Sequence, residues 1–268
     1  MRMKKICLTF SMGLVLLSVH GQQTGGRVVY ERTLQLQLFL PPGAAPQRMP
    51  PSTRKDRLEV LFGNGQCLRR AIDDELPEAM EASGGGMHLD VIAPGGGSDN
   101  ETFTDFAAGK VVSQRELGGR NYVITDTIQR LNWKLTGRTS TILNYPCQQA
   151  VAQRIGIRMR PGLENGMMKM LEAPDTVTVT AWFTLSVPAP AGPEYQGQLP
   201  GLILGLEMDN GRVMYQAVEL SAKTDLAAIK PPAKGKSLSA AEFAAERKKF
   251  MAAMQRNVGR GGNIRIGG

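Results

Sequence analysis

The sequence is poor in the residues that most often carry catalysis: its 268 residues include two histidines and three cysteines. Once an N-terminal export signal is removed, His88 remains, in a glycine-rich stretch that offers no rigid base or nucleophile beside it. No phosphate-binding loop, dinucleotide fingerprint or zinc-ligand spacing is present. We therefore expect a protein that is not an enzyme and requires no cofactor.

A hydrophobic run long enough to cross a membrane is also missing. The run from Ile6 to Val19 follows a basic start and is short, which is typical of a secretory signal peptide. We expect cleavage after Gly21, and the absence of a cysteine just after the run argues against a lipid anchor. This predicts an exported protein of the periplasm or outer-membrane periphery, not membrane-spanning after cleavage.

Two cysteines, Cys67 and Cys147, lie beyond the predicted signal. An oxidising compartment would permit a disulfide between them. Two buried free thiols are the alternative, because cysteine is among the most buried residue types. The sequence leaves both possibilities open.

Alternating apolar and polar residues dominate the chain and predict β-strands. The clearest case is Thr176 to Leu185, in which the odd positions from Val177 to Phe183 face one side. Gly63-Asn64-Gly65, Gly118-Gly119 and Asp209-Asn210-Gly211 indicate hairpin turns. Strands are expected at 28–40, 57–62, 66–71, 102–105, 110–117, 120–125, 133–143, 147–158, 176–185, 202–208 and 211–219. The fold class is mainly β (α+β): a curved antiparallel sheet or half-barrel, with a C-terminal helix.

That helix is predicted from Ser239 to about Asn257. Ser239 and Glu242 form a capping-box pattern, and a stripe that includes Phe243 and Phe250 follows at helical spacing. The stripe either covers the chain's own sheet or docks on a partner. The expected order is a signal peptide (1–21), a β domain (22–225), a linker and helix (226–257) and a disordered Gly/Arg tail (258–268). Export argues against nucleic acid as a partner of the basic tail.

The segment 192–203 reads Gly-Pro-Glu-Tyr-Gln-Gly-Gln-Leu-Pro-Gly-Leu-Ile. It resembles the signature of the GLPGLI family, secreted proteins of Bacteroidetes-type bacteria with no assigned biochemistry. The resemblance extends from about Phe103 to Glu219, and Gln198 departs from it where the family name has Gly. It implies that 157–175 is an insertion relative to usual members.

The motif allows two interpretations. Pro200-Gly201 is a strong turn pair, with glycine free to take a positive φ, so the motif can be a corner that positions two strands. It can also be a rim that binds a partner or ligand. The residues concerned are Trp182, Pro193, Leu199, Pro200, Gly201, Leu202 and Ile203.

A methionine cluster offers a possible metal site, at Met159, Met167, Met168 and Met170. Thioether sulfur is a soft ligand that suits Cu(I). Adaptable apolar packing is the alternative, because Met fills irregular gaps and Arg160 and Lys169 nearby would repel a cation.

The sequence therefore favours a non-catalytic accessory or binding module of the cell envelope, with an outer-membrane or other envelope protein as its partner. A periplasmic carrier of a lipid or other apolar ligand is one alternative, by analogy with half-barrel lipoprotein carriers. Cu(I) binding by methionine is another.

Overall fold

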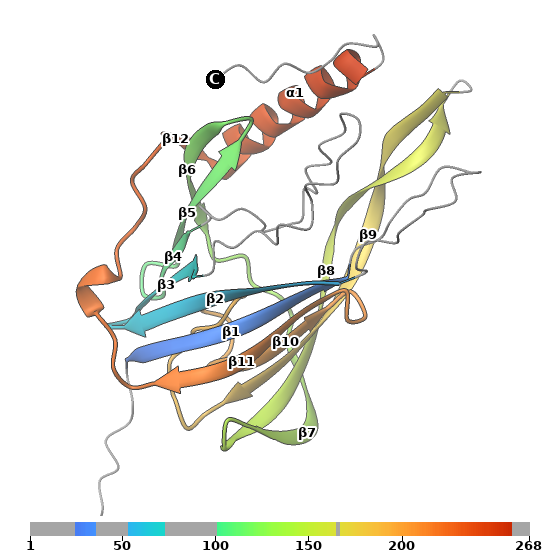
Figure 1. Ribbon diagram of the computed structural model, residues 1–268. Helices are drawn as coiled ribbons and strands as arrows, with labels where there is room; N and C mark the ends of the chain where they lie inside the picture. Colours follow the sequence, from blue (N-terminus) through green and yellow to red (C-terminus); the bar gives the residue numbers. More distant parts are fainter. Residues whose placement is uncertain (1–24, 36–52, 73–100, 165–166, 259–268) are drawn as a thin grey trace, which may run out of the picture.

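The structure is a computed structural model that describes residues 25–35, 53–72, 101–164 and 167–258. A single twelve-stranded sheet runs through it in the order β12-β6-β5-β4-β3-β2-β1-β11-β10-β9-β8-β7 (Figure 1). Neighbouring strands are antiparallel except for β12 and β6, which are parallel. This confirms the predicted fold class of a curved, mainly antiparallel sheet with a C-terminal helix.

The first half of the sheet contains β1 (Gly26–Gln35), β2 (Thr53–Gly63), β3 (Gln66–Ala71), β4 (Thr102–Asp105), β5 (Lys110–Leu117) and β6 (Arg120–Thr127). The second half contains β7 (Lys134–Ile142), β8 (Tyr145–Glu164), β9 (Met167–Thr184), β10 (Leu202–Met208) and β11 (Val213–Ser221). A short 3-10 helix, η2 (Leu226–Ala228), then leads to β12 (Lys236–Ser239) and α1 (Ala240–Val258).

The predicted hairpin turns are confirmed. Asn64 and Gly65, between β2 and β3, have φ values of 52° and 73°. Gly118 and Gly119, between β5 and β6, have values of 59° and 74°. Positive φ at both central residues gives the turn a twist that matches the flanking strands, which is why Asn and Gly occupy these positions.

The sheet has an inner face, defined here by Val28, Tyr30, Val60, Val179 and Tyr215, each at most 2% exposed. The register of β1 with β2 and β11 brings these side chains to one side. The alternation predicted for Thr176 to Leu185 is confirmed, since Val177, Val179, Ala181 and Phe183 are all buried.

Two segments cover the inner face. Residues 185–201, called the inner segment below, pack against its centre, and α1 covers the end formed by β5, β6 and β12. A separate cluster on the opposite, outer face joins Leu61 and Phe103 to Ile229, just after η2. The curved sheet is therefore closed on parts of both faces by its own chain.

The capping box at the start of α1 is confirmed. The Ser239 amide donates to Glu242 Oε2 at 2.7 Å, and the Glu242 amide donates to Ser239 Oγ at 3.3 Å. The apolar stripe of the helix contacts its own sheet: the Phe243 and Tyr122 rings lie 5.5 Å apart, and Phe250 lies against Gly118. Within the described residues, no helix is both long and apolar enough to span a bilayer.

Two features of the sheet differ from the predictions. Strand β8 continues to Glu164, past its predicted end at Arg158, and β9 begins at Met167, before its predicted start at Thr176. Both are longer than predicted because they pair with each other as far as Glu164 and Met167. Strand β12 was missed, since four residues carry no usable alternation and its parallel pairing to β6 is non-local. The predicted signal peptide, the stretch 36–52, the acidic and glycine-rich stretch 73–100 with His88, and the tail from 259 lie outside the described residues.

Candidate functional site

The inner segment occupies the place where a half-barrel would hold a ligand. Val187 and Ala191 are fully buried, and Leu199 is 5% exposed. All three belong to the same cluster as Val28, Val60 and the other inner-face residues. The chain therefore fills the centre of its own inner face with apolar side chains.

A partly buried ion pair fixes this segment to the sheet. Arg69, on the inner face of β3, pairs with the Glu194 carboxylate and donates to the Pro193 carbonyl oxygen at 3.1 Å. The Tyr215 hydroxyl, on β11, donates to the same carboxylate at 3.1 Å. Burial lowers the pKa of the Arg69 guanidinium, but the adjacent carboxylate outweighs it and holds the pKa above its ordinary value. One side chain of the segment thus contacts both β3 and β11, which are far apart in sequence and are separated in the sheet by β2 and β1.

Gln198, the position that departs from the GLPGLI signature, makes three hydrogen bonds. Its Oε1 accepts from the Leu131 amide at 2.9 Å and from Trp133 Nε1 at 3.0 Å. Its Nε2 donates to the Gln129 carbonyl oxygen at 2.9 Å. The glutamine therefore ties the inner segment to the connection between β6 and β7, which the sequence alone did not indicate.

Gly201 is required for a close approach and not for a positive φ. A Cβ atom at this position would lie 2.0 Å from the Thr184 carbonyl oxygen. The expectation of a positive φ at Gly201 was wrong; in this segment positive φ occurs at Tyr195 (56°) and Gly197 (76°). Glycine is needed at position 201 because the chain re-enters the sheet there directly against Thr184, the last residue of β9.

The motif residues predicted as a corner or a rim lie mostly in the interior. Pro193, Leu199, Gly201, Leu202 and Ile203 are buried, and the Ile203 carbonyl oxygen accepts a 2.6 Å hydrogen bond from the Tyr30 hydroxyl. Trp182 is half-buried and pairs with Gly205 across β9 and β10, and Pro200 is exposed. This arrangement is that of a strand corner.

Cys67 and Cys147 are buried free thiols in the structure, on β3 and β8. Each has a local contact: Cys67 lies beside Thr104, and the Cys147 thiol donates to the Tyr145 carbonyl oxygen at 3.4 Å. Burial raises the pKa of Cys67 to about 12 and also raises that of Cys147. The sequence left open a disulfide or two free thiols, and the structure contains two free thiols.

The four methionines of the possible copper site fall on one hairpin. Met159 lies on β8 opposite Glu172, and Met167, Met168 and Met170 lie on β9. Their side chains are outside the described part of the structure, so copper binding stays a prediction. Among the residues that are described, no group of three or more His, Cys, Asp or Glu side chains is placed to hold a metal ion.

That hairpin forms an arm that projects from the sheet, defined here as residues 152–178 of β8 and β9 (Figure 1). The pairing of β7 with β8 ends at Val151, and that of β10 with β9 ends at Val179. Beyond these two residues each strand has only the other as a strand partner in the described structure, and one further backbone bond, from the Asp209 N–H to the Thr178 carbonyl oxygen, lies at the base. A two-stranded ribbon without further packing is at best marginally stable in water.

The arm carries the most exposed large apolar side chains in the described structure. Ile155 is 82% exposed and Ile157 is 71% exposed. They stand two residues apart on β8 and therefore share a face of the ribbon. The sequence analysis missed this feature because alternation shows that two residues share a face, but not whether another layer covers that face.

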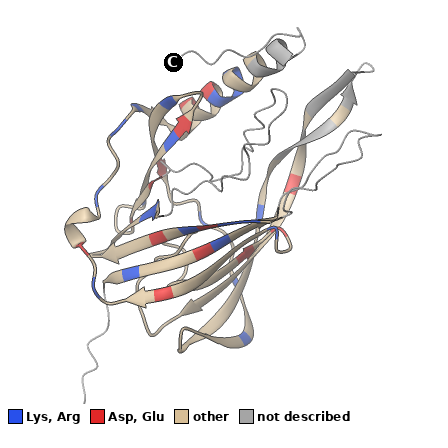
Figure 2. Cartoon of the chain, in the orientation of Figure 1, with Lys and Arg blue, Asp and Glu red and all other residues tan. Residues whose placement is uncertain are grey.

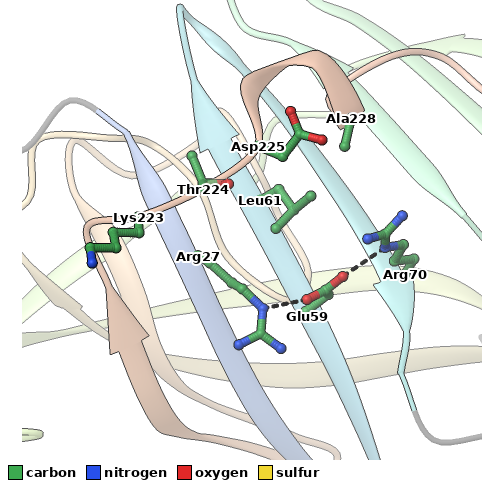
Figure 3. A pocket seen from close by; sticks show the side chains of 8 residues that line it. All are labelled: Arg27, Glu59, Leu61, Arg70, Lys223, Thr224, Asp225 and Ala228. Atoms are coloured by element: carbon green, nitrogen blue, oxygen red, sulfur yellow. Dashed lines mark hydrogen bonds and ion pairs between the residues drawn. The ribbon is translucent and has the colours of Figure 1, made fainter.

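The outer face has a shallow pocket of about 440 Å³, shown in Figure 3. Glu59 lies at its floor, between Arg27 on β1 and Arg70 on β3, and Arg70 Nε donates to Glu59 Oε1 at 2.7 Å. Burial opposes ionisation of Glu59, but the hydrogen bonds from both arginines outweigh it and lower the pKa of this carboxyl. The remaining lining residues are Leu61, Lys223, Thr224, Asp225 and Ala228.

Charges of both signs alternate across this outer part of the sheet (Figure 2). Arg27 also pairs with Glu219 at 3.1 Å, so both arginines at the pocket are matched by carboxylates. A site whose charges already satisfy one another has little left to attract an ion. The pocket is therefore a weaker candidate for binding than the arm.

A family model described as a protein of unknown function (Porph_ging) matches residues 133–205, which include β7, the arm and the inner segment. The match falls within the region that resembles the GLPGLI family, and the GLPGLI name stays a prediction. No curated protein matches the chain.

Two solved structures are similar to the chain at 14% sequence identity: PNGF-II in a P21 and in a C2 space group. Their TM-scores are 0.48 and 0.49, and the similarity covers 85% and 84% of this chain. It covers 34% and 33% of those chains, so this chain spans about a third of their length.

We predict that Gly201→Ala destabilises the protein by about 1–3 kcal/mol, because the added methyl would overlap a backbone oxygen that cannot move alone. Gly156→Ala is the matched control, since a Cβ there meets nothing within 4 Å, and its effect should stay within about 0.5 kcal/mol. Urea unfolding followed by circular dichroism measures both. Equal stabilities for the two variants would contradict the close approach at Gly201.

We also predict two free thiols per chain in protein that lacks residues 1–21. After unfolding without reductant, both should react at once with a thiol reagent. In the folded protein both should react slowly, because burial keeps the thiols neutral and inaccessible. Absence of reactive thiols in the unfolded, unreduced chain would establish the disulfide instead.

Proposed function

We propose that the protein is a non-catalytic binding module of the cell envelope that holds a partner protein through the arm. The observation that carries the proposal is the exposure of Ile155 and Ile157 on a ribbon that packs against the body only at its base, where Ala152 and Val177 are buried. Exposed apolar side chains gathered on a projecting element are typical of interaction sites.

Export to the envelope rests on the signal-peptide pattern of residues 1–21. The absence of catalysis rests on the scarcity of histidine and on the lack of any recognised catalytic motif in the sequence. An outer-membrane or other envelope protein is the partner class that this location offers.

The alternative of an apolar-ligand carrier has less support. A carrier needs an open apolar face, and here Val187, Ala191 and Leu199 already cover the centre of the inner face. Opening it would break the Arg69–Glu194 ion pair and leave a charge without its partner, which is costly.

The test compares Ile155→Thr/Ile157→Thr with Met214→Thr/Val218→Thr, which changes two exposed apolar residues on β11. Threonine is β-branched and preserves strand propensity while removing apolar surface. We expect the arm variant to lose at least about tenfold in affinity for the partner, since two aliphatic side chains buried on binding contribute more than the ~1.4 kcal/mol to which tenfold corresponds. The β11 variant should retain it.

The measurement has two stages. First, tagged full-length protein is crosslinked in the cell of origin. We then purify a partner that is recovered in stoichiometric amount with both the wild type and the β11 variant. Its affinity for all three proteins is measured by calorimetry, after circular dichroism has shown that they are folded. Equal affinity of the arm variant and the wild type would refute the proposed role of the arm.

A further inference from the structure

The free edges of the arm point to a specific mode of binding. In the described structure, no strand pairs with the outer edge of β8 beyond Val151, although the strand continues to Glu164. The unpaired N–H and C=O groups of such an edge are a template for another strand. Strand addition satisfies them while placing alternate side chains against the partner.

The β8 edge is better suited to this than the β9 edge. Strand β9 carries Pro174 within the arm, opposite Ile157, and proline has no N–H to donate to an added strand. Strand β8 contains no proline from Val151 to Arg160. Ile155 and Ile157 also lie on β8, so an added strand there would lie directly beside both of them.

The charge of β8 selects the partner strand. Between Ala152 and Leu163 the sequence has three arginines, Arg154, Arg158 and Arg160, and no acidic residue. Side chains directly opposite across two strands stand about 4.5–5.5 Å apart, so opposite charges stabilise the pair and like charges destabilise it. An acidic strand fits this edge and a basic strand does not.

The same charges disfavour a second copy of this chain as the occupant. The arginines occupy even-numbered positions, which are positions of one face of a strand. Of their side chains the structure describes that of Arg154, which is exposed. Antiparallel pairing of two β8 edges about a two-fold axis perpendicular to the sheet would bring the arginine-bearing faces side by side. The partner must then be a different chain.

We propose that the outer edge of β8, from Ala152 to Arg160, binds by strand addition an extended acidic segment of another protein. In this segment apolar residues alternate with Glu or Asp: the apolar side chains pack beside Ile155 and Ile157, and the carboxylates face the arginines. This inference rests on the proposed function and specifies the partner segment and its pairing.

The test uses two nonapeptide probes, one alternating Glu with Val and the other alternating Lys with Val. We expect the acidic probe to bind the purified protein at least about tenfold more tightly than the basic probe in fluorescence anisotropy. Arg154→Glu/Arg158→Glu should reverse that preference, and Arg154→Gln/Arg158→Gln should abolish it. Glu164→Gln serves as a control, which should change neither affinity, because position 164 lies outside the proposed edge of residues 152–160.

Hydrogen–deuterium exchange then locates the probe. Protection confined to residues 152–160 supports strand addition at β8; protection elsewhere, or binding without backbone protection, overturns it. Equal affinity for the two probes, or no binding of either, also overturns it. The crosslinked partner separates the two proposals. If its binding requires Ile155 and Ile157 but the acidic probe is not preferred, the arm binds its partner by another mode than strand addition. If its binding does not require the arm, the proposed function itself is refuted.

Discussion

The contact between Arg69 and Glu194 is the interaction on which the rest of the structure depends. A strongly curved sheet must cover its inner face, and here residues 185–201 of the same chain do so. Arg69 brings a full charge into that interior, where it pairs with Glu194, and the Tyr215 hydroxyl donates to the same carboxylate. An ion pair removed from water is not in itself a large source of stability, but loss of Glu194 would leave the buried Arg69 without its carboxylate. The pair therefore specifies where the inner segment lies more than it adds to the free energy of folding.

The position of the inner segment determines what the molecule offers to others. Because apolar residues of the segment fill the centre of the inner face, the surface left for binding is at the periphery of the sheet. There the two strands of the arm extend beyond their neighbours and carry Ile155 and Ile157 into solvent. The motif that resembles the GLPGLI signature and the arm thus have separate roles. The first closes the inner face, with Gly201 against Thr184 and Gln198 bonded to the β6–β7 connection; the second projects from the body.

Local patterns in the sequence predicted much of this fold. Asn64-Gly65 and Gly118-Gly119 require positive φ and mark their hairpins, and Ser239 with Glu242 marks the start of α1. The alternation from Val177 to Phe183 assigned the buried face of β9. The remaining features depend on contacts between distant residues. Nothing near Arg69 in the sequence points to Glu194, 125 residues away, and nothing near Gln198 points to Leu131 and Trp133. The exposure of Ile155 likewise follows from where β7 and β10 end, which no local pattern encodes.

The central claim is that the inner segment is a permanent part of the core, whereas the edges of the arm are exposed to solvent and free to bind a partner. Amide hydrogen exchange of the free protein tests it most directly, because exchange reports local opening residue by residue. The account predicts that two amides of this region exchange as slowly as those of the central strands β1 and β11. They are the Ile203 N–H, which donates to the Ala191 carbonyl oxygen at 2.9 Å, and the Ala191 N–H, which donates to the Ala189 carbonyl oxygen at 2.7 Å. Amides along the outer edges of residues 152–164 and 167–178 should exchange orders of magnitude faster. Rapid exchange throughout residues 187–203, with the arm protected, would contradict the account.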